Sequence, residues 1–433
     1  MTSQIKNIKT EFVEYLRQGA KPREDWRVGV EIELFGFDAR TKQRLDNGQV
    51  QAVLRGLAKS ESELIFESGA LVETRSANGS KWTIEPGGQI EFSSAPQTSL
   101  HDIERDLQMA YADLRKVGAA LNLKFLALGF DPLRTIDEQN WFMKPRYKLM
   151  KPYLATRGQR AWDMMTRTCS VQVNLDYENK TDLIKKFIIG NRLAPTVAAI
   201  FANSPFAGGE DTGCQSMRVA TWLETDANRC GVSPLALRRE FSLEDFIEYA
   251  LDVPMLFAQR GNDYVQDFTG KPFRDFLGNK QFSPTIEDWQ THLTTIFTEV
   301  RLKNYLEFRA ADGGNLEHAL AIAALWKGLL YDAESLEKAL LIAPQLTAQE
   351  FIKLQRDVLK NGLQTVCGAV KVLDLAKQII LLATEGLARQ APDEIRFLEV
   401  LRHRILIAEK SPADLLLESW NNSMDRVFEL TAI

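Results

Sequence analysis

The sequence is poor in the residues on which disulfide-rich and zinc-binding proteins depend. Its 433 residues include only four cysteines and four histidines. The cysteines are widely separated, form no CxxC pair and match no zinc-binding spacing, and the histidines form no HExxH motif. These absences exclude a disulfide scaffold, a zinc finger and a zinc protease of the usual kind.

Other common signals are absent too. The chain has no GxGxxG and no GxxxxGK[ST] motif, so neither of the familiar nucleotide-binding loops is indicated. The net charge is -5, which gives no reason to expect a nucleic-acid partner. No apolar run is long enough to span a membrane, and the N-terminus lacks the apolar core of a signal peptide. We therefore expect a cytosolic protein with no membrane partner.

Pairs of polar residues on strand-like segments are the most informative feature present. Glu31 and Glu33 are two residues apart, as are Gln172 and Asn174, and residues i and i+2 of a strand point to the same face. Glu307 and Arg309 show the same spacing in a third segment. The segment 85–91 (EPGGQIE) places Glu85 and Glu91 on either side of a Pro-Gly-Gly turn.

These acids favour a cation site if the segments join one sheet. Alternating polar and apolar residues are ordinary on a sheet with one wet face, and that remains the simpler interpretation of any single pair. However, several carboxylates on one polar face repel one another unless cations lie between them. Oxygen-rich sites suit magnesium or manganese, magnesium commonly accompanies the phosphates of ATP, and the planar fork of an arginine suits phosphate.

The pattern of elements predicts an α+β fold. Strands are expected from distant segments, with helices covering one face of an antiparallel sheet. Residues 207–233 are polar and glycine-rich, which is typical of a binding loop or lid. Beyond residue 315 the sequence is almost entirely helical in pattern. We therefore expect residues 1–315 to form the catalytic sheet region and residues 316–433 a helical layer packed on it.

Six motifs together resemble the glutamate–cysteine ligase family. They are VGVEIE at 28–33, EPGGQIEFS at 85–93, MMTRTCSVQVNLD at 164–176, FANSPF at 201–206, DWQTHLTTIF at 288–297 and YLEFRAADGG at 305–314. The resemblance implies a glutamine-synthetase-like fold with a curved antiparallel β-sheet. It also implies that ATP, L-glutamate and L-cysteine give γ-glutamylcysteine through a γ-glutamyl phosphate, with Mg2+ (or Mn2+) as cofactor, for glutathione or related thiol biosynthesis.

The resemblance implies roles for individual residues. Arg309 and Glu307 would be catalytic, and Arg309 would stabilise the transferring phosphoryl group. The implied metal-site residues are Glu31, Glu33, Glu85, Glu91, Glu307 and Gln172. Arg146 and Arg218 would hold the carboxylates of the amino-acid substrates, with Asn174 and Trp222 nearby. Cys169, beside the Gln172 strand, is a further candidate for substrate binding, although a plain buried thiol is the commoner role of a free cysteine.

Two other functions stay open at this point. Leu256 and the unusual segment 131–142 depart from the family pattern, which leaves room for a related carboxylate–amine ligase with a different acceptor amine. A non-catalytic glutamate or nucleotide sensor is the third possibility, against which the complete set of acids argues. Expected partners are small-molecule substrates only, and the chain would act as a monomer or homodimer.

Overall fold

An antiparallel sheet forms the centre of the protein. The computed structural model describes residues 2–142, 144–261, 263–279, 281 and 284–433. Within these residues the sheet has the strand order β14-β15-β7-β1-β5-β4-β3-β2, and β6 pairs with the second half of β1. Its strands are β1 Val28–Asp38, β2 Glu63–Glu67, β3 Ala70–Arg75, β4 Lys81–Ile84, β5 Ile90–Ser93, β6 Leu123–Leu126, β7 Ser170–Leu175, β14 Val300–Leu302 and β15 Leu306–Asp312.

The long strand β1 fixes the two faces of the sheet. Val30, Ile32 and Leu34 are fully buried in the core, whereas Glu31 and Glu33 alternate with them and point to the opposite face. The strand is long enough to pair with β5 and β7 through its first half and with β6 through its second. The polar positions of four strands therefore gather on one face, as the spacing predicted.

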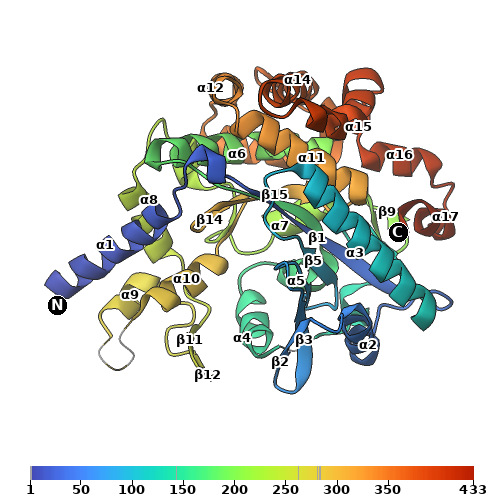
Figure 1. Ribbon diagram of the computed structural model, residues 1–433, viewed down its shortest axis with the longest axis horizontal. Helices are drawn as coiled ribbons and strands as arrows, with labels where there is room; N and C mark the ends of the chain where they lie inside the picture. Colours follow the sequence, from blue (N-terminus) through green and yellow to red (C-terminus); the bar gives the residue numbers. More distant parts are fainter. Residues whose placement is uncertain (1, 143, 262, 280, 282–283) are drawn as a thin grey trace.

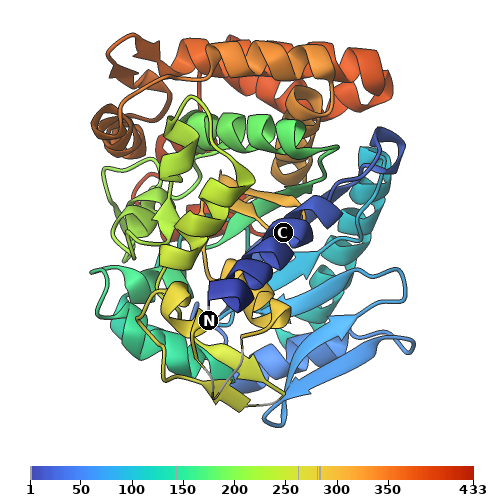
Figure 2. The same cartoon turned by 90° about the vertical axis from the view of Figure 1, so that its left-hand side faces the viewer.

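Helices cover the apolar face (Figures 1 and 2). The helices α3, α6 and α11 pack directly on the sheet, and α2 packs on β3 and β4. On β15, Phe308 stacks against Trp326 of α11 with ring centroids 4.5 Å apart, which leaves its sequence neighbours to face the other way. The bounds of these helices are α2 Asn47–Leu57, α3 Leu100–Leu121, α6 Lys180–Ile200 and α11 Leu316–Leu330.

The C-terminal part adds a second helical layer above α6 and α11 (Figure 2). It shares one continuous hydrophobic core with the sheet, running from Phe12 to Ile405. The helices of this part include a π-helical turn, Arg402–Ile407. The remaining helices of this part are α12 Ala333–Ile342, α13 Ala348–Asn361, α14 Val372–Gln390, α15 Glu399–Leu401, α16 Pro412–Ser419 and α17 Met424–Thr431, with the small hairpin β16 Val366–Cys367 and β17 Val370–Lys371.

The other elements surround the polar face of the sheet. They are α1 Thr2–Gln18, α4 Pro145–Leu154, α5 Ala161–Arg167, α7 Met217–Leu223, α8 Leu243–Asp252, α9 Phe273–Leu277 and α10 Ile286–Thr294, and the strand pairs β8 Phe206–Ala207 with β9 Glu210–Asp211, β10 Cys230–Gly231 with β13 Phe297–Thr298, and β11 Ala258–Arg260 with β12 Asp263–Val265. In the part of the chain that the structure describes, no helix is both long and apolar enough to cross a bilayer.

The α+β prediction is confirmed, and one local prediction is wrong. Residues 207–233 are not an open loop, because they contain α7 and three short strands. Ser216 caps α7 by accepting a hydrogen bond from the backbone N–H of Val219, and this serine begins the helix that holds Arg218 and Trp222. Glycines on either side of the helix concealed its short apolar pattern.

Candidate active site

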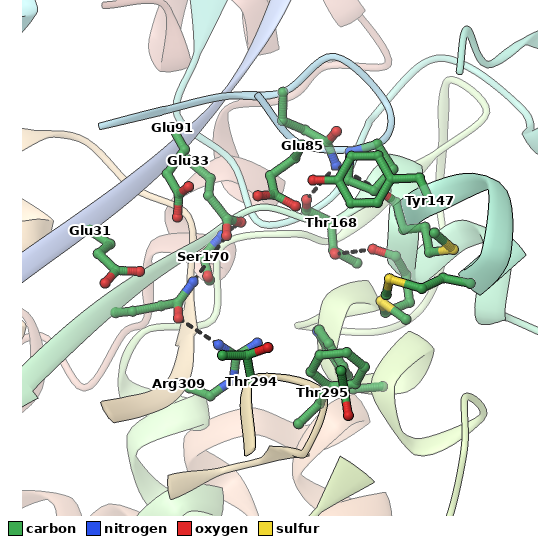
Figure 3. Close-up of a pocket in the computed structure, with 18 of the residues that line it drawn as sticks. Glu31, Glu33, Glu85, Glu91, Tyr147, Thr168, Ser170, Thr294, Thr295 and Arg309 are labelled. Atoms are coloured by element: carbon green, nitrogen blue, oxygen red, sulfur yellow. Dashed lines mark hydrogen bonds between the residues drawn. The ribbon is translucent and has the colours of Figure 1, made fainter. Parts of the chain in front are cut away.

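A pocket with a cavity volume of about 200 Å3 opens on the polar face of the sheet. Figure 3 shows Glu31, Glu33, Glu85 and Glu91 along one side of it and Arg309 with Thr294 and Thr295 across from them. The polar residues that line it are Glu31, Glu33, Glu85, Gln89, Glu91, Arg146, Tyr147, Thr168, Ser170, Gln172, Arg218, Thr294, Thr295, Arg301 and Arg309. An acidic wall thus faces an arginine-rich wall across one cavity.

The acidic wall is built by register. Glu33 of β1 lies directly opposite Glu91 of β5, and side chains in such opposed positions have Cβ atoms about 5 Å apart. Glu33 accepts hydrogen bonds from the backbone N–H of Ser170 at 2.7 Å and from the Gln172 amide at 3.0 Å. Glu31 accepts one from the Asn174 amide at 2.8 Å. Each carboxylate keeps oxygen capacity for a ligand in the pocket.

Mutual repulsion and burial make these carboxylates hard to ionise. Burial, together with the charges of Glu91 and Glu85, raises the pKa of Glu33 to about 8. Burial and the charges of Glu307 and Glu91 raise the pKa of Glu31 to about 7, and burial and Glu85 also raise the pKa of Glu91. A cation bound beside these carboxylates would offset their repulsion and favour their ionised form.

The Pro-Gly-Gly turn sets the position of Glu85 at the end of this wall. Gly87 packs so closely on α5 that a Cβ would lie 2.4 Å from the Thr166 carbonyl oxygen. Gly88 has a φ of +74°, which glycine adopts without strain. The buried Gln89 side chain accepts from the Gly87 N–H at 2.9 Å and donates to the Thr168 carbonyl at 3.0 Å. Glycine at positions 87 and 88 therefore allows the turn to hold Glu85 against α5.

A hydrogen-bonded chain links the two walls. The Gln172 amide donates to Glu33, and its oxygen accepts from Arg309 at 2.6 Å. Arg309 also donates to Glu307 at 2.5 Å. One terminal nitrogen of Arg309 donates to both Gln172 and Glu307, and these two bonds fix the direction of the guanidinium.

Glu307 belongs to a cluster of cations and does not line the pocket. Its carboxylate is 1% exposed and forms ion pairs with Arg301 at 2.9 Å, Lys303 at 2.7 Å and Arg309. Burial opposes its ionisation, but Arg301, Lys303 and Arg309 outweigh burial and hold the pKa of Glu307 well below its usual range. Because positions 307 and 309 share one face of β15, the acid and the base bind each other.

The other side of the pocket is basic and aromatic. Arg218 of α7 donates to the backbone carbonyl of Arg309 at 2.7 Å, and both guanidinium groups lie near the ring of Trp222. Arg146 of α4 donates to the hydroxyl of Tyr147 at 3.0 Å. These arginines approach the acidic wall from three different segments, so an anionic group in the cavity would meet several donors at once.

The structure brings together most of the residues singled out from the sequence. Pocket-lining residues among them are Glu31, Glu33, Glu85, Glu91, Gln172, Arg146, Arg218, Trp222 and Arg309. Asn174 and Glu307 lie directly behind, as partners of Glu31 and Arg309. Cys169 does not join them, since its fully buried side chain packs with Phe35, Leu128 and other apolar residues. Its neighbours Thr168 and Ser170 face the pocket, and strand alternation turns the thiol away.

Several pocket residues were missed at the sequence level. Arg301 pairs in register with Glu307 across β14 and β15, and its alternation with Lys303 offered a signal. Thr294 ends α10 and Thr295 follows it, and although both lie in the 288–297 motif, nothing in their residue type or spacing singled them out as pocket residues. The apolar lining formed by Met150, Met164 and Phe257 is likewise indistinguishable from core by sequence alone.

The donor set fits a divalent cation that is shared with a ligand. Among the described residues, no three carboxylate, histidine or cysteine side chains lie close enough together to hold a metal ion by themselves. Magnesium, however, is usually bound through one or two carboxylates plus waters and substrate phosphates. Glu33, Glu85 and Glu91 all line the pocket, and burial with repulsion between neighbouring acids raises the pKa of Glu33 and of Glu91.

The overall architecture resembles solved ligases. The crystal structure of a glutamate–cysteine ligase from Francisella tularensis in complex with AMP has a TM-score of 0.57 to this protein at 12% sequence identity, covering 94% of this chain and 87% of that one. A bifunctional glutathione synthetase from Pasteurella multocida has a TM-score of 0.51 at 12% identity, covering 98% of this chain and 53% of that one. At such low identity the likeness concerns the fold alone.

Sequence comparison identifies the family. The model of glutamate–cysteine ligase family 2 matches residues 27–429. Glutamate–cysteine ligase A of Oryza sativa subsp. indica is 40% identical over 97% of this chain and 87% of its own length. The ligases of Nicotiana tabacum and Arabidopsis thaliana are 39% and 38% identical, each over 97% of this chain and 82% of their own length. The chain belongs to glutamate–cysteine ligase family 2.

The expected cytosolic location is wrong by the same comparison. These plant relatives are all named as chloroplastic proteins. The expectation rested on the lack of a signal-peptide core in the first residues. Plastid transit peptides have no such core, being amphipathic and rich in serine and arginine, so its absence does not distinguish the two locations.

Proposed function

We propose that the protein ligates the γ-carboxylate of L-glutamate to the amine of L-cysteine with hydrolysis of ATP to ADP and phosphate. The observation that carries this proposal is one pocket in which a four-glutamate wall faces Arg146, Arg218, Arg301 and Arg309. Such a pocket suits two anionic reactants that must approach each other. The γ-carboxylate attacks the terminal phosphorus of ATP, and the amine of cysteine then displaces phosphate from the γ-glutamyl phosphate.

The acidic wall is proposed to hold Mg2+ through Glu31, Glu33, Glu85 and Glu91, with Gln172 beside them. Bound magnesium would supply positive charge to the phosphates, and manganese has similar ligand preferences. Glu31 and Glu33 are held toward the cavity by Asn174, Gln172 and the Ser170 N–H. A ligand set oriented in advance needs little rearrangement when the cation and ATP arrive.

Arg309 is proposed to stabilise the transferring phosphoryl group. Its position is fixed by Gln172 and Glu307, and its side chain is only 10% exposed, so its charge acts where water is scarce. Glu307 therefore acts as a positioning residue for Arg309, which differs from the metal-ligand role implied by the resemblance. Arg146 and Arg218 are proposed to hold the substrate carboxylates along the basic wall, with Trp222 beside them.

The test is an ADP-release assay with ATP, Mg2+ and L-glutamate. L-cysteine, L-2-aminobutyrate and a panel of other amino acids and amines are compared as acceptors, and the product mass is determined. We expect ADP release to require both amino acids and the cysteine product to have the mass of γ-glutamylcysteine. Turnover only with another amine would replace cysteine by that acceptor, and ATP binding without turnover on any acceptor would refute the ligase proposal.

A further inference from the structure

A second pocket lies where the C-terminal segment closes on the sheet, on the side of the molecule occupied by α16 and α17 in Figure 1. Its cavity volume is about 260 Å3, and it shares no lining residue with the active-site pocket. Its walls come from the π-helical turn Arg402–Ile407, from α16 and α17, and from the starts and ends of segments that belong to the sheet region. The backbone N–H of Ala127 donates to the Thr431 carbonyl at 3.0 Å and closes one side.

The charge of this second pocket comes from Arg404, which has no ion-pair partner among the described residues. Arg404 is the sole ionised residue of its described lining, because the pKa of the buried His318 is lowered to about 3 by burial and by Arg404. Arg404 forms no ion pair with any described residue, and its Nε and one terminal nitrogen have no hydrogen-bond partner there. Glu317 influences Arg404 only through its charge. A guanidinium whose buried nitrogens lack hydrogen-bond partners attracts an anion that can accept from them.

The remaining walls narrow the class of anion. Leu415, Leu416 and Leu430 offer apolar surface, and Asn203, Asn315 and Ser419 offer amide and hydroxyl groups. A carboxylate with a short aliphatic body matches this combination, with its charge at Arg404 and its chain along the leucines. The π-helical turn that presents Arg404 is itself a kind of helix distortion found often at functional sites.

The second pocket is joined to the active site through Asp312 at the end of β15. The backbone N–H of Asn203 donates to the Asp312 carboxylate at 2.8 Å, and a ring nitrogen of His318 lies 3.1 Å from its carbonyl oxygen. The same carboxylate accepts from the Ser216 hydroxyl at 2.8 Å, at the start of α7. Two residues further along α7, Arg218 binds the backbone of Arg309, three residues before Asp312.

We propose that this pocket is a second binding site for a small aliphatic carboxylate, and that its occupancy is transmitted through Asp312 to Arg218 and Arg309. Asn203 and His318 are the residues that belong both to the pocket and to the Asp312 network. A shift of either one on binding would alter the position of the strand end that places the two arginines. Such coupling is reciprocal, so substrates at the active site would change the affinity of the carboxylate as well.

Isothermal titration calorimetry with pentanoate tests the binding site in the full chain. We expect one binding event that is kept in Arg146→Gln, which removes an arginine of the active-site pocket, and weakened at least ten-fold in Arg404→Gln. Leu430→Trp, which fills the pocket mouth and keeps Arg404, should weaken binding to a similar extent and guards against a folding artefact. No heat with the wild type, or unchanged binding in both Arg404→Gln and Leu430→Trp, would overturn the site.

Transmission is tested in the ADP-release assay with and without pentanoate. We expect the KM for glutamate of the wild type to change at least two-fold, and that of Arg404→Gln to stay constant. An equal effect on both proteins would place pentanoate in the active-site pocket and overturn the proposal. Binding in the calorimeter with no change in KM or kcat would refute transmission through Asp312. The calorimetric arm does not depend on the ligase reaction, so failure of the proposed function is recognised separately.

Discussion

At the scale of single residues, the acidic wall is unfavourable in the empty pocket because its buried carboxylates repel one another. Glu33 and Glu91 are held opposite each other, and the raised pKa of each reflects burial and repulsion by neighbouring acids. An ordinary wet sheet face would avoid such a set, because each added carboxylate makes the next harder to ionise. The arrangement becomes favourable only when positive charge enters the pocket.

Glu85→Gln should nearly abolish turnover. The substitution keeps size and removes one proposed ligand charge, which is expected to cost about 4 kcal/mol in transition-state stabilisation, or roughly a thousand-fold in kcat. The ADP-release assay measures the loss, and Glu63→Gln on the exposed edge of β2 is the control. A fall of only a few-fold for Glu85→Gln would show that Glu85 holds no metal.

Glu33→Gln should inactivate the enzyme and also stabilise the free protein. The pKa of Glu33 is about 4.5 in the unfolded chain and is raised to about 8 in the folded protein. The folded protein therefore holds this proton more tightly, and the free energy of unfolding falls as the pH rises from 4.5 to 8. A glutamine amide does not ionise, so this fall in stability is absent in Glu33→Gln. We expect its free energy of unfolding to be about 2 kcal/mol higher than that of the wild type at pH 8. Urea unfolding without Mg2+ measures it, and the difference from wild type should shrink at pH 5.

At the scale of elements, the Pro-Gly-Gly turn and α5 behave as one unit. Arg44 donates to the Gly87 carbonyl at 2.8 Å and pairs with the buried Asp131 at 3.1 Å, which ties the turn to the segment after β6. Gln89 adds bonds to the end of α5. Glu85 is therefore placed by contacts that are distant in sequence and share one tight turn.

Gly87→Ala should separate this turn from α5. The added Cβ meets Thr166 backbone atoms at 2.4 and 2.6 Å, so the turn must move and Glu85 with it. We expect kcat to fall at least a hundred-fold and the melting temperature to drop by several degrees. The control is Gly278→Ala, where a Cβ meets nothing within 4 Å. Wild-type kcat in Gly87→Ala would show that Glu85 is not positioned by the turn.

The polar face of the sheet could be predicted from residue spacing, whereas contacts made by tertiary packing could not. The alternation of Glu31 and Glu33 with buried residues was readable because a strand has a period of exactly two residues per repeat. The cationic surround of Glu307 was not, since Arg301 and Lys303 reach it only when β14 pairs with β15. Whether Cys169 faced the pocket depended on where β7 began, and the boundary of a strand is the least predictable part of it.

At the scale of the whole molecule, two buried histidines link stability to pH. Burial lowers the pKa of both His292 and His318 to about 3, so both are neutral when folded. Below pH 6.5 the unfolded chain takes up protons that the folded one refuses, and each histidine then lowers the free energy of unfolding by about 1.4 kcal/mol per pH unit. That contribution is complete above pH 6.5 and is lost progressively as the pH falls toward 3.

His292→Gln should flatten this dependence by about one histidine. Its ring nitrogen lies 2.8 Å from the Ala250 carbonyl oxygen, a bond that a glutamine amide could replace. Urea unfolding at pH 7.5, 6 and 5 measures the slope, and His403→Gln, at an exposed position, is the control. A slope equal to that of wild type would mean that His292 is protonated in the folded protein.

We propose that residues 1–315 and 316–433 fold as one unit, although only the first part carries the catalytic site. Three features of α11 join the sheet to the helical layer. Trp326 stacks on Phe308 of β15 at 4.5 Å, Lys327 donates to the Thr98 carbonyl at 2.9 Å, and the Tyr331 hydroxyl, just after the helix, accepts from the Asp176 N–H at 2.8 Å. The part of the apolar face around Phe308 is therefore covered by α11, which lies beyond residue 315.

Residues 1–315 alone should fail to fold. Removing α11 exposes Phe308 and its neighbours, an apolar surface of the kind that drives aggregation. We expect a fragment of residues 1–315 to show no cooperative unfolding transition by circular dichroism and to bind a hydrophobic dye, while the full chain unfolds cooperatively. A sharp transition in the fragment would instead make residues 316–433 a separable domain. The Asp312 network would then have to be stable without His318, which contacts it from α11.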